Sequence, residues 1–146
     1  MKTINGQKFV AITAPELKDN GAPTITYVDT KGWTHVRVLF TVGVTDVAST
    51  AAPTLTECNT SGGSYAAITG AALAGVISAT DDGKMFAIDL DLTNGTRKRF
   101  IKPTITAADG TNGMNIAIHA ILSSKNSGTF AGAATESGLE ELISVG

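Results

Sequence analysis

Apolar and polar residues alternate between Trp33 and Val44, with the two-residue period of a half-buried β-strand. One face of this stretch carries only large apolar side chains, namely Val36, Val38, Phe40 and Val42. The opposite face is mixed and consists of His35, Arg37, Leu39 and Thr41. The pattern therefore predicts a long strand whose first face lies in a core and whose second face meets solvent or a neighbouring subunit.

The same alternation recurs from Met85 to Leu92, and two more predicted strands follow at Arg97 to Thr106 and Met114 to Leu122. The dipeptide Asn94-Gly95 separates the first two strands. It favours the type I′ turn of a β-hairpin, because both residues tolerate the positive φ that this turn requires. Another turn is predicted at residues 109–113. We therefore expect three consecutive antiparallel strands, each paired with the next.

Shorter elements flank these strands. Residues 1–23 contain the apolar run Phe9 to Ile12, which predicts a strand or an extended arm. Residues 24–122 are expected to form a sandwich, which includes a short hairpin made by Thr54 to Cys58 and Tyr65 to Thr69. Residues 123–146 are expected to be a linker and a short C-terminal helix.

The predicted helix covers residues 135–143, where Leu139, Leu142 and Ile143 share one helical face. Three glutamates, Glu136, Glu140 and Glu141, favour the N-terminal half of this helix through the macrodipole.

Composition favours a single all-β domain with an antiparallel sandwich. The 146 residues are 42% hydrophobic and only 16% charged, and they are rich in Thr, Ala and Gly, which suits strands and turns. A net charge of -2 gives no electrostatic reason to expect a nucleic-acid partner. Neither a membrane-spanning run nor a standard export signal is apparent, so we expect a soluble protein that does not contact a membrane.

Residues suited to catalysis are few. Cys58 is the only cysteine, and His35 and His119 are the only histidines. Both histidines are expected on strand faces opposite the apolar set, where surface or interface roles are far more common than membership of a catalytic triad. One cysteine and two distant histidines lack the spacing of a zinc site. We therefore predict no catalytic, cofactor-binding or metal-binding residue, and expect the protein not to be an enzyme.

A basic cluster, Arg97-Lys98-Arg99, lies at the start of a predicted strand. The simpler interpretation is a group of charges that keeps the strand soluble and prevents edge-to-edge pairing. The alternative is a contact with an acidic neighbouring protein. Aromatic residues do not alternate with these cations, as a single-strand nucleic-acid platform would require.

Five turn-and-strand segments carry a family resemblance: Tyr27–Trp33, Ala79–Ala87, Arg97–Phe100, Thr106–Thr111 and Ala120–Leu122. Together they resemble small head proteins of tailed bacteriophages, in particular capsid decoration or cement proteins. The resemblance implies β-sandwich or jelly-roll subunits, often trimeric, that clamp neighbouring capsid subunits. It therefore implies a virion structural protein on the capsid surface, made in the host cytoplasm. Its expected partners are the major capsid protein and copies of itself in a homotrimer, with no cofactor.

Apolar residues outside the predicted core are the candidates for subunit or capsid contacts: Phe9, Val10, Ile12, Leu39, Ile121, Leu139, Leu142 and Ile143. The alternative function is a β-sandwich binding module, such as a head fibre or a carbohydrate-binding domain. Such modules normally expose aromatic side chains, whereas this chain is 5% aromatic. Trp33 follows a Lys31-Gly32 turn and leads into a strand, so we expect it in the core or at a subunit interface.

Overall fold

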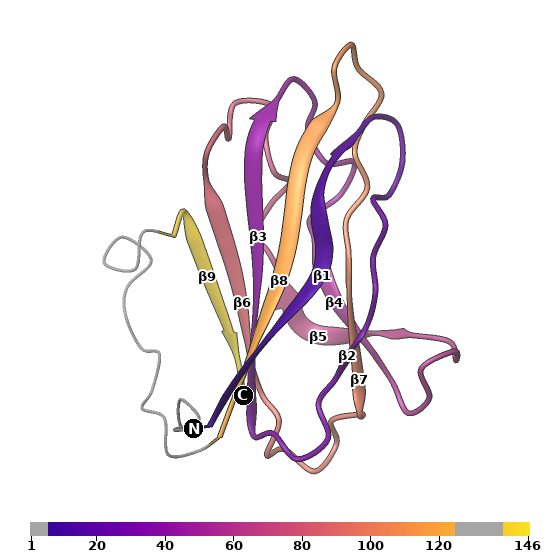
Figure 1. Cartoon of the computed structure of the whole chain (residues 1–146), viewed down its shortest axis with the longest axis vertical. Coiled ribbons are helices and arrows are strands. Elements are labelled where there is room, and N and C mark those ends of the chain that lie inside the picture. The colour runs from indigo at the N-terminus through magenta and orange to yellow at the C-terminus, as the bar shows by residue number, and fades with distance from the viewer. Residues whose placement is uncertain (1–5, 125–138) are drawn as a thin grey trace, which may run out of the picture.

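The computed structural model describes residues 6–124 and 139–146. The regular secondary structure of these residues consists of β-strands, without a helix. The strands are β1 (Gln7–Lys18), β2 (Val28–Asp29), β3 (His35–Thr45), β4 (Thr54–Cys58), β5 (Ala66–Ala72), β6 (Met85–Asp91), β7 (Phe100–Thr104), β8 (Met114–Ser123) and β9 (Glu141–Val145). They form two sheets, as Figure 1 shows. The prediction of an all-β sandwich is thus confirmed.

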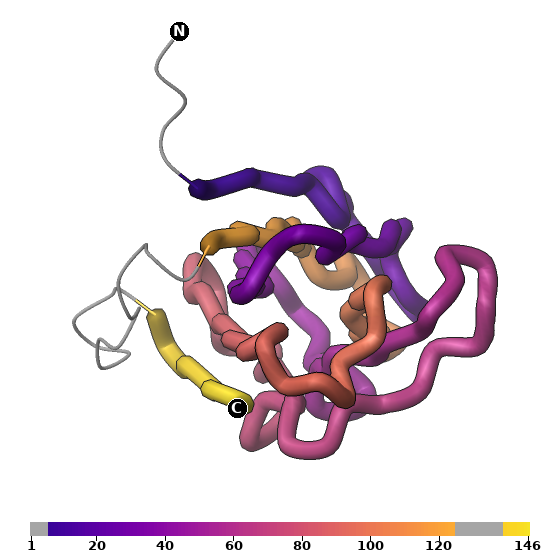
Figure 2. Tube along the Cα trace, turned by 90° about the horizontal axis from the view of Figure 1, so that it is seen from below, coloured from indigo at the N-terminus to yellow at the C-terminus, as the bar shows by residue number. Residues whose placement is uncertain are grey.

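The sheets have the orders β1-β8-β3-β6-β9 and β2-β7-β4-β5. The pairings are antiparallel except for β6 with β9, which is parallel. Figure 2 shows β9 beside β6 at one edge of the five-stranded sheet, with β1 at the other edge. The N-terminal and C-terminal strands are therefore the two edges of one sheet.

A single apolar core fills the space between the sheets. The inward residues predicted for β3 are buried, and Val36, Val38 and Phe40 are fully so. The four-stranded sheet contributes residues such as Leu55 and Ile101 to the same core. Full burial of one such side chain stabilises the fold by about 1.5–3 kcal/mol relative to exposure. The alternating pattern therefore placed the core face of β3 correctly.

The predicted run of three paired strands is wrong, although all three strands exist as β6, β7 and β8. β6 pairs with β3 and β9, whereas β7 pairs with β2 and β4 in the other sheet. β8 returns to the first sheet, between β1 and β3. Successive strands here change sheet, so their pairing partners lie far away in the sequence. The predicted hairpin of β4 with β5, by contrast, is confirmed.

The turn after β6 explains the missing hairpin. The Asn94 carbonyl accepts a hydrogen bond from the Arg97 backbone N–H at 3.0 Å, so Gly95 and Thr96 are the central turn residues. Asn94 and Gly95 both have negative φ, which a type I′ turn would not allow. The Asn94 side-chain oxygen also accepts a hydrogen bond from the Thr96 backbone N–H at 3.3 Å, as in an Asx turn, and a second one from the Thr96 hydroxyl at 3.0 Å. Asn94 therefore starts the turn, which leads the chain into the other sheet.

The C-terminal helix predicted for residues 135–143 is not found: residues 135–138 lie outside the described part, and Glu141–Val145 form strand β9. Ile143 and Val145 pack against the core from β9. The Glu141 carboxylate accepts a hydrogen bond from the Ala74 backbone N–H at 2.7 Å. Pairing with β6 thus overrides a helical pattern that is too short to be stable alone.

Candidate interaction surface

The five-stranded sheet turns one face to the core and the other away from it, and we call the second the outer face. Directly paired residues on neighbouring strands project to the same side, so the register aligns this face in rows. The first row is Phe9, Ile121, Arg37, Asp89 and Ser144, and the next is Ala11, His119, Leu39, Ala87 and Leu142. Apolar side chains thus lie in both rows and at both edges of the face.

The candidate contact residues divide between this face and the core. Those brought together on the outer face are Phe9, Leu39, Ile121 and Leu142. Phe9 is 69% exposed, which is unusual for a side chain of its size. The remaining candidates serve the interior: Ile12 belongs to the core, Val10 and Ile143 pack against it, and Leu139 is buried just before β9.

A buried ion pair lies among the apolar residues of the outer face. The Arg37 guanidinium donates two hydrogen bonds to the Asp89 carboxylate, Nε to Oδ1 and Nη2 to Oδ2, both at 2.6 Å. The two side chains are only 11% and 6% exposed. Because the charges neutralise each other with good geometry, this part of the face presents little net charge.

Sequence reasoning did not find this pair. Arg37 and Asp89 are 52 residues apart, and only the pairing of β3 with β6 makes them neighbours. The available signal was a charged residue in the middle of each alternating strand, on the face opposite its apolar set. Two such charges predict a cross-strand ion pair only when the two strands are already known to be neighbours in the sheet.

The residues considered for catalysis do not assemble. His35 and His119 lie on β3 and β8 of the five-stranded sheet, whereas Cys58 lies on β4 of the other sheet. Within residues 6–124 and 139–146, no three His, Cys, Asp or Glu side chains are grouped closely enough to hold a metal ion. The same residues contain no helix with the length and apolar character needed to cross a membrane.

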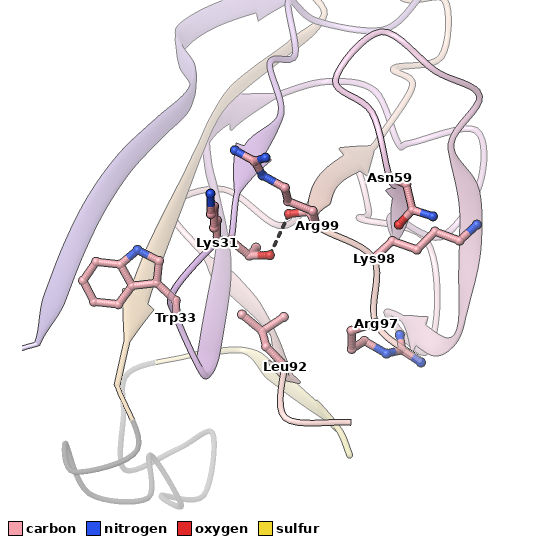
Figure 3. Close-up of a pocket in the computed structure, with 8 residues that line it drawn as sticks. Lys31, Trp33, Asn59, Leu92, Arg97, Lys98 and Arg99 are labelled. Carbon is pink, nitrogen blue, oxygen red and sulfur yellow. Dashed lines mark hydrogen bonds between the residues drawn. The ribbon is translucent and has the colours of Figure 1, made fainter. Parts of the chain in front are cut away.

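A second surface feature lies at the end of the sandwich where β3 begins and β6 ends. Segments before β3, after β4 and between β6 and β7 line an open pocket of about 390 Å³ there. Its lining residues, drawn in Figure 3, are Thr30, Lys31, Trp33, Asn59, Leu92, Arg97, Lys98 and Arg99. We call it the basic pocket, because half of these residues are Lys or Arg.

A tight turn positions one wall of the basic pocket. The Trp33 backbone N–H donates to the Thr30 carbonyl at 3.0 Å, so Lys31 and Gly32 are the central residues of the turn. Gly32 has a φ of 86°, which fits the third position of a type II turn and favours glycine there. The turn leaves Lys31 exposed and places Trp33 partly buried against the core, as the sequence predicted.

Two arginine–carboxylate pairs flank the basic pocket. Arg99 donates to both oxygens of Asp29, at 2.8 and 2.6 Å, and these hydrogen bonds lower the pKa of Asp29 to about 2. The Arg97 Nη1 atom lies 3.7 Å from the Glu57 carboxylate, which is an ion pair without a direct hydrogen bond. The two pairs therefore differ in geometry: the first is bidentate, and the second is long.

Comparison of the chain with models of known protein families, with curated proteins and with solved structures finds no match in any of the three.

Proposed function

We propose that the protein is a non-enzymatic structural protein of a tailed-phage virion, which decorates and stabilises the capsid through many protein–protein contacts. The observation that carries this proposal is the strand order of the two sheets. The pairs β1–β8, β2–β7, β3–β6 and β4–β5 are nested within one another along the chain. This nesting supports a jelly roll, in which a long hairpin rolls up into two sheets, and viral capsid proteins and lectins use that fold.

The fold alone does not select a function, since jelly rolls serve several. The resemblance of the turn-and-strand segments to phage head proteins favours the capsid role. The outer face adds a physical reason, because Phe9, Ile121, Leu39 and Leu142 form an apolar patch around a self-neutralised ion pair. Such a surface suits contact with an uncharged, apolar partner surface.

A second copy of this chain is the partner that best fits the outer face. Each copy presents the same apolar residues around the same Arg37–Asp89 pair. Because the two charges of this pair neutralise each other, contact between copies does not bury an unpaired charge from it. We propose that the protomers form a homotrimer, in which one part of this face contacts a different part of the same face on the next copy, as the head-to-tail contacts of a threefold ring require. A trimer would then attach to the capsid by three linked contacts, and linkage raises the effective concentration of each weak contact.

The capsid role is tested by locating the protein in purified particles. Phage particles from the source of this sequence are banded on a density gradient, and the chain is quantified by mass spectrometry relative to the major capsid protein. We expect the chain in the intact-particle band at a fixed ratio to the capsid protein. Cryo-electron microscopy of these particles should then show β-sandwich density outside the shell.

Two results would contradict the capsid role. The first is a chain that is absent from particles at any stage. The second is saturable binding of the purified protein to a glycan array with no association with particles, which would establish the carbohydrate-binding alternative. The array is informative because lectins also use the jelly roll.

A further inference from the structure

We propose that the basic pocket binds an acidic peptide segment of another protein. In this arrangement the carboxylates of the peptide meet the cations of the pocket, and an adjacent apolar side chain packs against Trp33 and Leu92. Figure 3 shows Trp33 and Leu92 on one side of the pocket with Lys31 and Arg99 near them, and Asn59, Arg97 and Lys98 on the other side, where the Lys98 ammonium points outward. The pocket therefore offers an apolar wall beside a charged one.

The charges of the pocket leave a positive surplus. Four cations line it, and two carboxylates pair with them: Asp29 with Arg99, and Glu57 with Arg97. Four minus two leaves two positive charges, which are those of Lys31 and Lys98. Within residues 6–124 and 139–146, neither lysine forms a side-chain ion pair. The surplus therefore lies on two side chains that are available to a ligand.

Arg97 adds to the positive character of the site. Its Nε and Nη1 atoms are buried, and neither has a hydrogen-bond acceptor in the described part of the chain. The 3.7 Å contact with Glu57 neutralises this guanidinium less well than a bidentate pair would. The Glu57 carboxylate instead accepts a hydrogen bond from the Lys98 backbone N–H at 3.0 Å. Glu57 therefore interacts with both this N–H group and the Arg97 guanidinium.

The size and sign of the site favour a peptide over a nucleic acid. Nucleic acids need a continuous basic surface, whereas here Asp29 and Glu57 interrupt the cations and the whole chain carries a net charge of -2. Single strands also need several stacking aromatic residues, and Trp33 is the only aromatic residue in the lining. A short peptide with alternating acidic and apolar residues matches both walls of the pocket.

Trp33 provides a direct readout, because it is the only tryptophan in the chain and lines the pocket. The probe is a five-residue peptide of alternating glutamate and leucine with blocked ends. The matched control peptide carries glutamine in place of glutamate. We expect the glutamate peptide to change Trp33 fluorescence saturably and the glutamine peptide to bind at least about tenfold more weakly. Raising the salt concentration should weaken the first interaction through screening.

Variants locate the binding to the pocket. The double substitution Lys31→Gln with Lys98→Gln should weaken binding of the glutamate peptide by about tenfold, since each exposed ion pair contributes up to roughly fivefold. Lys102→Gln is the matched control: Lys102 lies on β7, which follows Lys98 in the chain, but it contacts the Tyr65 ring outside the pocket, so binding should be unchanged. Circular dichroism checks that each variant keeps its strand content.

Three results would overturn the proposal. These are equal binding of the two peptides, an unchanged affinity in the double variant, and tighter binding of inorganic phosphate or of a single-stranded oligonucleotide than of the glutamate peptide. The inference goes beyond the proposed capsid role and does not depend on it, because the assay uses purified protein without particles. A failure here would leave the particle experiment unaffected, and the reverse also holds.

Discussion

The outer face and the basic pocket both contain a bidentate arginine–aspartate pair, yet the two pairs lie in different surroundings. On the outer face, Arg37 and Asp89 are 11% and 6% exposed. At the basic pocket, Arg99 and Asp29 have comparable distances but are 45% and 39% exposed. Similar bond geometry therefore does not imply similar energetic weight, because solvent screens the second pair and not the first.

The two regions also differ in the kind of partner that they favour. On the outer face the charges of Arg37 and Asp89 neutralise each other, and apolar side chains surround them. Both charges therefore stay paired when this face contacts another apolar surface. At the basic pocket two lysines remain without a carboxylate in the described part of the chain, so an acidic partner is favoured. We therefore propose the neutral face for self-contact and the charged pocket for a different partner.

The largest expected effect is from breaking the buried pair. Asp89→Ala should lower the free energy of unfolding by about 3–5 kcal/mol, because it removes the carboxylate that accepts two hydrogen bonds from a buried guanidinium. Urea unfolding followed by circular dichroism measures this change. The double substitution Asp89→Leu with Arg37→Met removes both charges and should recover most of the loss. A cost below about 1 kcal/mol for Asp89→Ala would show that the pair is not buried as described.

A smaller effect is expected from the exposed pair, and it depends on pH. The Arg99 guanidinium holds the pKa of Asp29 at about 2, below its ordinary value of 3.8, so the folded state favours the carboxylate. Its contribution to stability should be fully present above about pH 4 and lost as the pH falls through 2. Its size should be well below that of the buried pair, because solvent screens the exposed charges.

Asp29→Asn isolates this contribution. Unfolding free energies of the natural chain and the variant are compared at several values between pH 2 and pH 7. The difference between them should be constant above pH 4 and shrink as the pH falls toward 2. A difference that does not change over this range would mean that Asp29 has the same pKa in the folded and unfolded states.

Local patterns predicted much of the fold. The alternation in β3 identified both its buried face and its outward face, because each residue's side is set by the strand period. The outward face included Leu39, and three further residues proposed for contacts, Phe9, Ile121 and Leu142, also reached the outer face. What alternation cannot supply is the identity of the neighbouring strand, and here pairing is mostly distant in sequence.

The errors share this cause. Asn94-Gly95 is typical of a hairpin turn, but the two sheets require the chain to cross between them at that point. The spacing of Leu139, Leu142 and Ile143 fits a helix, but the free edge of β6 accepts Glu141–Val145 as a strand. The basic pocket was partly visible as Arg97-Lys98-Arg99, whereas Lys31 and Trp33 join it only after folding.

The central claim is that the outer face joins copies of this chain, and Phe9 tests it most directly. Phe9 is 69% exposed, so Phe9→Asp should leave the fold stable while placing a charge in the proposed contact. Val76→Asp is the matched control, because Val76 is also exposed but lies in the connection between β5 and β6.

Light scattering at micromolar concentration measures the mass of each protein. We expect three times the 14.9 kDa chain mass for the natural chain and for Val76→Asp, and the mass of one chain for Phe9→Asp with an unchanged thermal midpoint. A natural chain that is monomeric, or a Phe9→Asp variant that remains trimeric, would contradict the claim.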